Sequence, residues 1–362
     1  MHVNDLDTPA LVIDLDRVEA NVSEMAVRAR DAGVRLRPHT KTHKMVEMAR
    51  LQLEAGASGL TCATLGEAEV MADAGAQDIL IAFPLVGPEK LSRLRVLRER
   101  ARVLVSLDSL EVAQGLGSLA GATGEPVEVY VEVDTGLHRL GRAPGAPSVE
   151  LVQRVAEVAG VRVIGLLSHA GHAYRFADPI AREQVIARQI DDLVATRRAC
   201  AEVGIVIEEI SVGSTPTVRD ELLRLGVNEV RPGTYIFNDT NMIDLGVATQ
   251  DTCAARILAT VISRPSPTRF VLDAGTKSLA ADGAGRPGWV QVVGRDDLTM
   301  EFLSEEHGVG VIEPSSTTPL KIGDKVLIIP RHVCTAVNLF DVATGVRGEL
   351  VDGPILVAGR AR

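Results

Sequence analysis

Two histidines and two lysines fall within six residues of one short stretch, RPHTKTHK at residues 37–44. The residues up to this stretch alternate like a strand, and MVEMARLQLEAG directly after it has a helical period. Lys41 is therefore expected at a strand-to-helix junction, which is where α/β folds place their catalytic groups. A lysine at such a junction can bind an aldehyde cofactor covalently.

A second candidate pair lies near the C-terminus, where the motif HVC places His332 and Cys334 two residues apart. The motif follows the strand-like run KVLIIP, and if the extended conformation continues, both side chains point to one face. Imidazole and thiolate together suit Zn²⁺ better than Mg²⁺ or Ca²⁺, and two protein ligands leave open the positions that a catalytic ion needs. Taken alone, an HxC motif seldom binds metal, so the pair is a hypothesis that needs further support.

The elements that position Lys41 are short apolar runs that alternate with amphipathic helices between residues 34 and about 237. Eight consecutive β-then-α units favour a closed parallel (β/α)8 barrel of the TIM type over an open sheet. No GxGxxG motif follows the first run, which counts against dinucleotide binding. The eight predicted strands are VRLRPHT, GLTCAT, DILIAF, RVLVSLD, VEVYVEVD, VRVIGLLSH, IEEISVGS and EVRPGTYIF.

The catalytic groups of such a barrel lie at the C-terminal ends of its strands. Besides Lys41, these ends carry DTGLHRLG, SHAGHAY, GSTPT and RPGTY after the fifth to eighth strands. GSTPT (213–217) and RPGTY (231–235) combine glycine with hydroxyl residues, whose backbone N–H and side-chain O–H groups can face a phosphate. A lysine, a phosphate cradle, an arginine and a histidine at one barrel mouth together predict pyridoxal 5'-phosphate as cofactor.

The pattern changes after about residue 250, where β-like runs are separated by Gly, Pro and Asp turns with no convincing helices between them. This pattern predicts an all-β C-terminal domain. The opening run PALVIDL precedes the barrel strands, so we expect it to pair with that domain. The expected division is therefore an N-terminal strand at residues 1–16, the cofactor-binding barrel at 17–245 and the β domain with the metal site at 246–362.

Composition narrows the classes of partner. The 362 residues carry a formal net charge of −10, which argues against nucleic acid as a partner. The N-terminus lacks a basic segment followed by an apolar run, and no stretch approaches 18 uninterrupted apolar residues. We therefore expect no membrane association and a cytoplasmic location. Three of the four scattered cysteines, Cys62, Cys200 and Cys253, are expected to be ordinary buried thiols.

Several of these motifs together resemble the D-serine dehydratase and D-threonine aldolase family, which consists of fold-type III, alanine-racemase-like pyridoxal-phosphate enzymes. The combination of RPHxKTHK with a late PxHxC is the most specific part of the resemblance. It implies that Lys41 carries the cofactor and that His332 and Cys334 bind a divalent ion, Zn²⁺ in first place, with Mn²⁺ or Mg²⁺ as alternatives. The resemblance covers nearly the whole chain through DTPALVIDLDRVEANV, LRPHTKTHK, GEAEVMADAGAQDILIAFPLVGPEKL, DAGTKSL, EEHG and PRHVCTAVNLFD.

Further assignments follow from the similarity to the wider alanine-racemase-like group. Arg139 of DTGLHRLG resembles an arginine near the cofactor's phenolic oxygen, and His169 resembles a histidine beside its pyridine ring. Arg231 occupies the position of an arginine on the ring nitrogen, where it would keep that nitrogen unprotonated, although some aldolases of the family do not keep it. The remaining cofactor contacts implied by the resemblance are Tyr174, Gly213, Ser214, Thr215, Gly233, Thr234 and Tyr235.

Two lyase reactions on D-β-hydroxy-α-amino acids would use all of these residues. In dehydration, Lys41 removes the α-proton, the hydroxyl leaves with help from the metal, and the product hydrolyses to a 2-keto acid and ammonia. In retro-aldol cleavage, His169 or His172 is the candidate base, and the products are glycine and an aldehyde. The cysteine of HVC and the motif SHAGHAY resemble the dehydratases, so a D-serine dehydratase is the first prediction and a D-threonine aldolase the alternative. Serine, threonine and 3-hydroxyaspartate are all candidate substrates.

Two other functions are less well supported by the sequence. An alanine-type racemase needs a tyrosine from the C-terminal domain, but Tyr130, Tyr174 and Tyr235 all precede that domain. A non-enzymatic pyridoxal-phosphate carrier is a single barrel, and the additional β domain counts against it. The resemblance also implies a homodimer in which barrel and β domain face each other between subunits.

Overall fold

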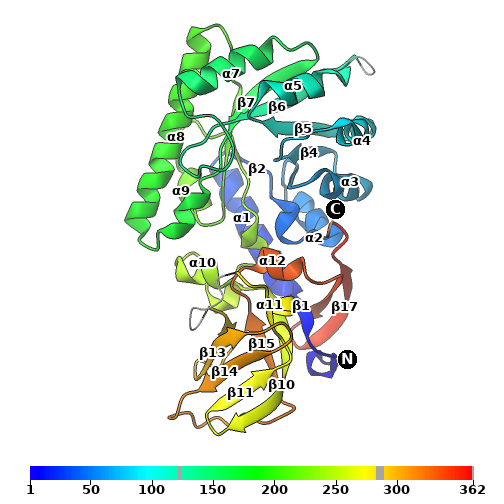
Figure 1. The fold of residues 1–362 in the computed structure, drawn as a ribbon, viewed down its shortest axis with the longest axis vertical. Helices are drawn as coiled ribbons and strands as arrows, with labels where there is room; N and C mark the ends of the chain where they lie inside the picture. Colours follow the sequence, from blue (N-terminus) through cyan, green and yellow to red (C-terminus); the bar gives the residue numbers. More distant parts are fainter. Residues whose placement is uncertain (121–123, 283–288, 361–362) are drawn as a thin grey trace. The chain divides into compact units, whose positions relative to one another are not determined.

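The structure is a computed structural model that describes residues 1–120, 124–282 and 289–360. It divides into two compact units (Figure 1). The barrel unit comprises Ser23–Lys41 and Met48–Gly233, and the β unit comprises Met1–Val22, Thr42–Glu47 and the chain from Thr234 onward.

The barrel unit is built on eight parallel strands in the order β2-β9-β8-β7-β6-β5-β4-β3. An isolated parallel bridge between His39 and Thr61 joins the end of the β2 segment to β3, so the sheet closes on itself. This arrangement confirms the predicted (β/α)8 barrel. The strands are β2 (Arg35–Leu36), β3 (Leu60–Cys62), β4 (Asp78–Ile81), β5 (Arg102–Leu107), β6 (Val127–Glu132), β7 (Val161–Leu167), β8 (Glu209–Val212) and β9 (Glu229–Val230).

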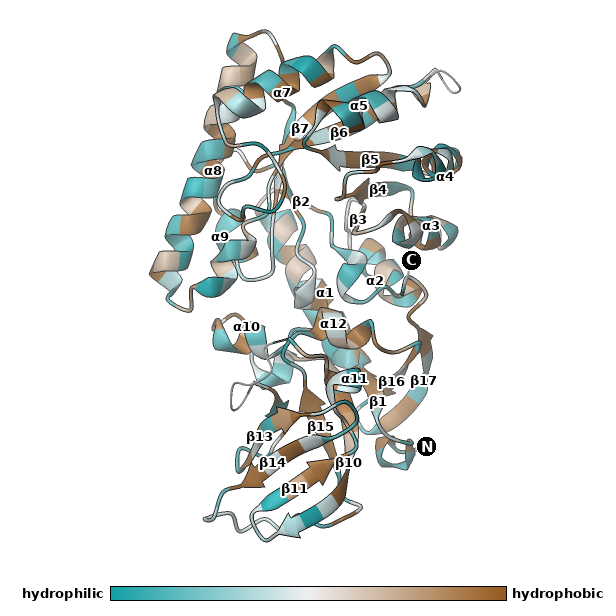
Figure 2. Ribbon diagram, in the orientation of Figure 1, coloured by the Kyte–Doolittle hydropathy of each residue, from teal (hydrophilic) through white to brown (hydrophobic). Residues whose placement is uncertain are grey.

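Helices follow the strands because the connecting residues supply caps and amphipathic patterns. The hydroxyl of Thr64 accepts the N–H of Glu67 at the start of one helix, and the carboxylate of Asp178 caps another that begins with Pro179. Figure 2 shows apolar barrel strands and helices of mixed polarity. The helices are α1 (Leu15–Asp31), α2 (Val46–Glu54), α3 (Leu65–Asp73), α4 (Pro88–Arg98), α5 (Leu110–Gly117), α7 (Ala146–Ala156), α8 (Pro179–Glu202) and α9 (Val218–Glu221), with short 3₁₀ helices η2 (Thr40–Thr42), η3 (Gly171–Arg175) and η4 (Thr234–Ile236) after β2, β7 and β9.

A network of charged side chains fills part of the barrel interior. Arg37 is 2% exposed, and its guanidinium bonds to Asp78 and, at 2.7 Å, to Glu229. Glu229 also accepts the hydroxyl of Ser211 at 2.7 Å, and Ser211 in turn accepts Nη1 of Arg231 at 2.5 Å. Because buried charges are stable only when they are paired, this chain of bonds fixes the guanidinium of Arg231 within the barrel.

The β unit contains a nine-stranded sheet in the order β11-β14-β13-β12-β15-β10-β1-β16-β17, and an additional β10–β11 pairing closes six of its strands into a small antiparallel barrel. The N-terminal strand pairs antiparallel with β10 and parallel with β16. The strands are β1 (Ala10–Asp14), β10 (Ala255–Ser266), β11 (Arg269–Leu272), β12 (Gln291–Val292), β13 (Leu298–Leu303), β14 (Gly308–Ile312), β15 (Lys325–Ile329), β16 (Val342–Arg347) and β17 (Leu350–Leu356).

The β unit differs in two ways from the sequence expectation. It begins at Thr234 rather than after residue 245, and it contains the short helices α10 (Thr240–Asp244), α11 (Thr276–Leu279) and α12 (Val333–Val337). The early boundary has a physical cause, because the hydroxyl of Thr240 donates to the carbonyl of Trp289 at 2.9 Å within the β unit. The motif RPGTY is therefore shared, with its first three residues in the barrel unit and its last two in the β unit.

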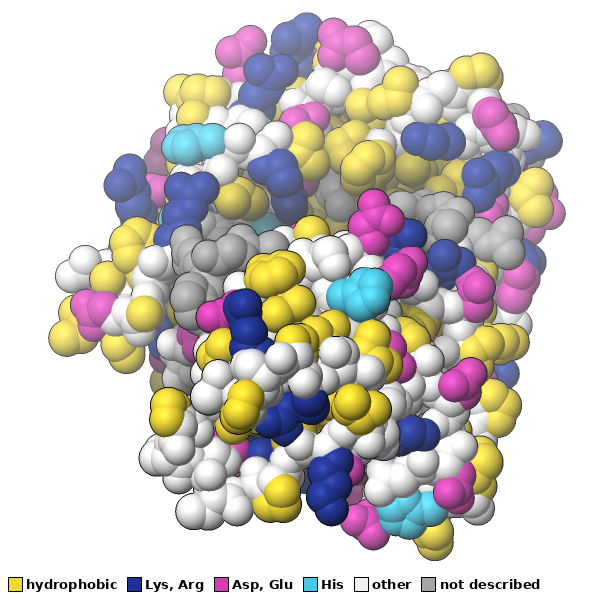
Figure 3. All heavy atoms as spheres, turned by 60° about the horizontal axis from the view of Figure 1, so that its bottom comes forward, with side chains coloured by type: hydrophobic (Ala, Val, Ile, Leu, Met, Phe, Trp, Pro, Cys, Tyr) yellow, Lys and Arg dark blue, Asp and Glu magenta, His cyan; other side chains and the backbone are white. Residues whose placement is uncertain are grey.

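Two features of the described residues concern the surface charge and the hydropathy of the helices. On the face shown in Figure 3, the described basic and acidic side chains are interspersed and form no continuous patch of one sign. Within the described ranges, no helix has both the length and the hydropathy of a membrane span.

Candidate active site

Lys41 lies in η2, directly after the first barrel strand, and its position is set by the residue before it. The hydroxyl of Thr40 donates to the carboxylate of Glu67 and lies 3.1 Å from the carbonyl of Thr61. Glu67 is fully buried and also accepts the N–H of Ala63 at 3.2 Å. These bonds join η2 to β3 and to the start of α3, and thereby hold the backbone of Lys41 at the C-terminal end of the barrel strands.

His169 lies at the C-terminal end of β7 and is a neutral imidazole at physiological pH. Its Nδ1 is 3.2 Å from the carbonyl of Gly213. A carbonyl can only accept, so Nδ1 carries the proton and Nε2 is left as an acceptor. Burial lowers the pKa of His169 to about 3, and the positive charges of Lys41, Arg139 and Arg231 act in the same direction. Because all three cations act on the pKa of His169, the four side chains lie in the same region of the barrel.

The two arginines of this neighbourhood are held differently. Arg231 is 5% exposed and donates through Nη2 to the carbonyl of Ser168 at 2.9 Å, in addition to its bond with Ser211. Arg139 is half exposed and lies 4.0 Å from the carboxylate of Glu132. Burial raises the pKa of Glu132, and both arginines oppose that rise. Arg231 is thus rigid, whereas Arg139 can adjust to a bound group.

The loop after β8 combines a close backbone approach with buried hydroxyl groups. Gly213 has a φ of +132°, and a Cβ added there would lie 2.5 Å from the backbone nitrogen of Arg231, so no other residue fits. Ser214 and Thr215 are both buried, and the hydroxyl of Ser214 is 2.8 Å from that of Thr217. A glycine that allows close backbone approach, followed by two hydroxyl residues, fits a phosphate group.

The other predicted phosphate contacts are divided between the two units. Gly233 is the last residue of its segment of the barrel unit, and Thr234 and Tyr235 begin η4 in the β unit. All three are buried. The hydroxyl of Thr234 lies 3.8 Å from Sγ of Cys334, so it is next to the predicted metal pair within the β unit.

His172 and Tyr174 lie in η3, a short distance along the chain from His169. His172 lines a cavity of about 790 Å³ with Asp134, Gly136 and His138. Burial lowers the pKa of His172, while the carboxylate of Asp134 opposes this. The groups that act on His172 therefore differ from those that act on His169, and Tyr174 is 36% exposed in the same short helix.

The predicted metal pair lies at the start of α12. Strand β15 ends at Ile329, so the extended conformation assumed for the HVC motif does not continue through it. His332 is the extended N-cap residue, and Cys334 is in the first helical turn. The helix begins here because the buried carboxylate of Asp239 accepts the N–H of Val333 at 3.0 Å. His332 and Cys334 nevertheless come within hydrogen-bonding reach of each other.

The charges around this pair favour a cation. Burial opposes protonation of His332, but Cys334, Asp239 and Asp282 outweigh it and raise the pKa of His332 to about 9. The thiol of Cys334 donates to the hydroxyl of Thr42 at 3.3 Å. Across the described residues, no group of three or more His, Cys, Asp or Glu side chains is placed to bind one metal ion. An imidazole and a thiol are ligand types that suit Zn²⁺, and a set of two protein ligands fits a catalytic ion better than a structural one.

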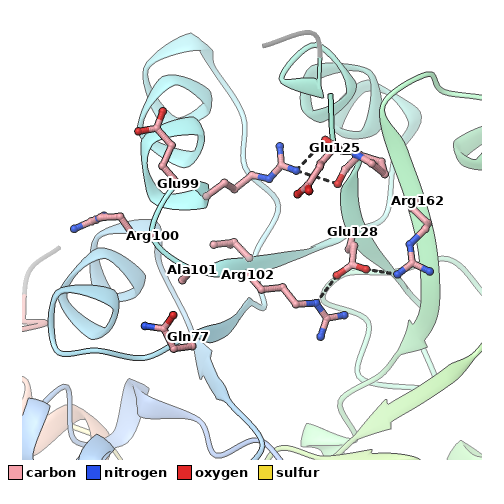
Figure 4. Close-up of a pocket in the computed structure, with 11 residues that line it drawn as sticks. Gln77, Glu99, Arg100, Ala101, Arg102, Glu125, Glu128 and Arg162 are labelled. Atoms are coloured by element: carbon pink, nitrogen blue, oxygen red, sulfur yellow. Dashed lines mark hydrogen bonds and ion pairs between the residues drawn. The ribbon is translucent and has the colours of Figure 1, made fainter. Parts of the chain in front are cut away.

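Figure 4 shows a different pocket, which is lined by charged residues near the N-terminal ends of β5, β6 and β7. Glu128 bridges Arg102 at 2.6 Å and Arg162, and Arg98 donates to the carbonyls of Glu125 and Pro126 at 3.0 Å. Glu128 is thus paired with two arginines, whereas Arg98 bonds to backbone carbonyls. Since the groups around Lys41 lie at the opposite ends of the strands, this pocket is not the candidate active site.

Sequence reasoning missed several residues that hold the site in place. Glu67 accepts the hydroxyl of Thr40, and both Ser168 and Ser211 bond to the guanidinium of Arg231. Oδ2 of Asp282 lies 2.7 Å from Nδ1 of His332. Ser168 directly precedes His169 in the motif SHAGHAY, so its position was a usable signal. The other residues lie far from their partners in sequence, and no local pattern marks them.

Comparison with known proteins identifies both units. Residues 13–241 match the alanine racemase N-terminal domain, and residues 254–346 match a putative serine dehydratase domain. The D-threo-3-hydroxyaspartate dehydratase of Delftia sp. (strain HT23) is 37% identical over 347 residues, which cover 91% of each chain. The D-threonine aldolase of Arthrobacter sp. is 33% identical over 351 residues, which cover 96% of this chain and 91% of the aldolase.

Solved structures give the same result. The D-threonine aldolase from Filomicrobium marinum superimposes with a TM-score of 0.91 at 37% identity, covering 99% of this chain and 96% of that one. The Delftia dehydratase has been solved with a histidine replaced by alanine and, in a metal-free form, with a cysteine two positions further along replaced by alanine. The chain therefore belongs to the alanine-racemase-like family of D-serine dehydratases and D-threonine aldolases, which are pyridoxal-phosphate-dependent lyases.

Proposed function

We propose that this chain is a lyase that depends on pyridoxal phosphate and a divalent metal ion and acts on D-β-hydroxy-α-amino acids, with dehydration as its main reaction. The observation that carries the proposal is the imidazole–thiol pair of His332 and Cys334 in a chain whose barrel gathers Lys41, Arg139 and His169. The first pair suits a Lewis-acidic ion, and the second group suits a phosphorylated aldehyde cofactor.

Each barrel residue has a role that its surroundings support. Lys41 would hold the cofactor covalently, the loop Gly213–Thr215 would bind its phosphate, and the neutral ring of His169 would lie against its pyridine ring. When bound, pyridoxal phosphate withdraws electrons from the substrate's α-carbon and so acidifies the α-proton. The amine of Lys41 is then the group of this chain that accepts that proton.

Arg231 is proposed as the partner of the pyridine nitrogen. Its Nη1 and Nη2 donate to Ser211 and Ser168, but a guanidinium has five N–H donors, so it keeps capacity for one more acceptor. A guanidinium does not give up its proton, and the ring nitrogen would therefore remain unprotonated. This arrangement limits how far the cofactor can delocalise charge.

The predicted metal pair supports a lyase reaction, in which the substrate's β-hydroxyl takes part. A divalent ion held by His332 and Cys334 would supply a Lewis acid for the substrate's β-hydroxyl, which is a poor leaving group without one. Support comes from the D-threo-3-hydroxyaspartate dehydratase, in which a histidine and a cysteine with the same two-residue spacing were each replaced by alanine, and the cysteine variant was solved in a metal-free form. Zn²⁺ is the proposed ion, and Mn²⁺ and Mg²⁺ are the alternatives.

Retro-aldol cleavage is the second candidate, favoured by the 37% identity to the Filomicrobium aldolase. It requires a base for the β-hydroxyl. A general base works best when its pKa lies near the working pH, and a pKa of about 3 makes His169 a poor match. His172 is the better match in basicity, whereas His169 has the better position beside Lys41. A racemase needs a tyrosine as its second base, and Tyr130 is buried in the barrel and bonds to Glu209. Tyr235 does lie in the β unit, contrary to the sequence expectation, but it is 4% exposed and is assigned to the phosphate, so the racemase remains less favoured than the two lyases.

The products of D-amino-acid turnover test the proposal directly. We expect purified protein supplied with pyridoxal phosphate and Zn²⁺ to convert D-serine or D-3-hydroxyaspartate to a keto acid and ammonia, faster than it converts D-threonine to glycine and acetaldehyde. Keto acid, ammonia and glycine should be measured for each substrate, with the L-enantiomers as controls. Glycine and aldehyde as the main products would favour the aldolase, and no product with any D-substrate would refute both lyases.

We also propose a homodimer in which the lysine and the metal pair that act together come from different subunits. The proposal follows from the family resemblance and from the location of Lys41 and Cys334 in separately folded units. A two-fold dimer would then form two equivalent pairings.

Mixing a K41A chain with a C334A chain tests this arrangement. If subunits share sites, each heterodimer contains one intact site, and activity should return to about half of the wild-type value per heterodimer. Subunit exchange is verified with differently tagged chains, and mixtures of each variant with itself serve as controls. Activity that stays at the level of the parent variants after exchange would mean that each subunit builds its own site.

A further inference from the structure

We propose that Asp282 is a positioning residue for the metal ligand His332, and that its carboxylate fixes the imidazole with Nε2 presented to the ion. The inference rests on the proposed metal centre. Oδ2 of Asp282 lies 2.7 Å from Nδ1 of His332, although the two residues are 50 positions apart in the sequence. A bond of this length between a carboxylate and a histidine ring is a charge-assisted hydrogen bond rather than a loose ion pair.

The chemistry of the two groups decides which ring nitrogen remains for the metal. An ionised carboxylate can only accept, so Nδ1 of His332 must carry the proton in this bond. In a neutral imidazole the other nitrogen, Nε2, then has the free lone pair that a metal ion needs. Metal-binding histidines commonly donate their second ring nitrogen to a carboxylate, which fixes the ring orientation and makes the ligand more basic. Asp282 stands in that relation to His332.

Asp282 is itself held in place from the same helix. The hydroxyl of Thr335 lies 2.9 Å from Oδ2 of Asp282 and 2.9 Å from the carbonyl of His332. The carboxylate is therefore bonded both to the ligand ring and to the first turn of α12. This second contact restricts the carboxylate to one side of the ring, so it can orient His332 and not merely neutralise it.

A purely stabilising ion pair is a weaker account of the same contact. The side chains of His332 and Asp282 are 39% and 46% exposed, and pairs with such exposure contribute little to the stability of the fold. Asp282 is also no third ligand in this arrangement, because the described residues contain no group of three ligands around one point. Metal affinity should therefore respond to Asp282, whereas the melting temperature of the metal-free protein should not.

The test measures Zn²⁺ affinity of the full chain with pyridoxal phosphate bound, by competition with a chromogenic chelator at fixed pH. We expect D282A to weaken Zn²⁺ binding by about 10- to 100-fold. The amide oxygen of D282N can still accept from Nδ1, so that variant should lose less than about tenfold. D352N, which removes an exposed carboxylate on β17 of the same unit, is the matched control and should bind Zn²⁺ like the wild type.

A spectroscopic readout separates positioning from general damage. In ¹⁵N spectra of metal-free protein recorded at a pH high enough for the His332 ring to be neutral, the resonances of the wild type and of D282N should report the Nδ1–H form, and D282A should lose that preference. Zn²⁺ affinity of D282A within twofold of the wild type would overturn the inference, as would a loss in D352N of the same size. The H332A variant tests the metal centre separately from the role of Asp282. If H332A binds Zn²⁺ as tightly as the wild type, the metal centre itself is refuted, and the role of Asp282 with it.

Discussion

The K41A variant is expected to lose turnover of every D-amino acid by about 10⁴-fold or more, the scale seen when a residue that bonds covalently in catalysis is removed. Lys41 would provide both the covalent attachment of the cofactor and the amine that accepts the α-proton, so no other group compensates. Wild-type protein should absorb in the near-violet with pyridoxal phosphate bound. Treatment with borohydride should fix the cofactor permanently to the peptide that contains Lys41, as mass spectrometry of a digest would show.

Two other lysines serve as controls for this assignment. Lys44 donates to the carbonyl of Gly359 at 3.3 Å, and Lys277 bonds to Glu306 at 2.8 Å on the surface. K277A should keep wild-type activity and absorbance, because that side chain is solvated. Recovery of the fixed cofactor on Lys44 or Lys277 would show that the assignment to Lys41 is mistaken.

Removal of the metal should stop turnover while the cofactor stays bound. A Lewis acid stabilises charge on a departing or developing oxygen by several kcal/mol, so we expect chelation to reduce the rate by at least about 10²-fold, and Zn²⁺ to restore it. The H332A and C334A variants should show the same loss without restoration. Rates are measured with D-serine, and near-violet absorbance shows that the cofactor remains.

The fold should survive the loss of the ion, which keeps this experiment interpretable. The carboxylate of Asp239 is buried and caps α12 through Val333, and Arg360 donates to the carbonyl of Asn338 at the end of the same helix at 2.9 Å. These bonds hold α12 without a metal. Melting temperatures of chelated and metal-loaded protein should therefore be close. Chelated enzyme that keeps full activity, with metal removal verified by elemental analysis, would refute the Lewis-acid role.

The sequence by itself determined the fold class and the ends of the strands that carry the chemistry. Alternation of apolar runs with amphipathic helices is a local property, and eight such units in succession leave a closed parallel barrel as the consistent solution. Lys41 could be placed at the mouth of that barrel because only a strand end joins an alternating pattern to a helical one. Gly213 was a candidate because it stands with hydroxyl residues after a predicted strand, and the structure adds that a Cβ there would meet the backbone of Arg231.

Local pattern was less informative where the chain leaves its regular elements. The HVC motif looked like a continuation of β15, but α12 begins at Val333 because Asp239, which is 94 positions away, accepts its N–H. The boundary of the barrel moved from residue 245 to Gly233 because Thr240 bonds inside the β unit. In both places a hydrogen bond between distant segments outweighs the preference of the local sequence.

Only the tertiary structure showed which side chains hold the reactive groups in place. Glu67 accepts the hydroxyl of Thr40 from α3. Ser211 links Arg231 to the ionic network inside the barrel, and Asp282 contacts His332 from a segment 50 residues earlier. Each contact depends on the closure of a sheet or the packing of two segments, and sequence spacing does not encode it. The residues that react could be recognised from their type and their position along the chain. The residues that orient them were recognised from the distances between their side chains and the reactive ones in the folded structure.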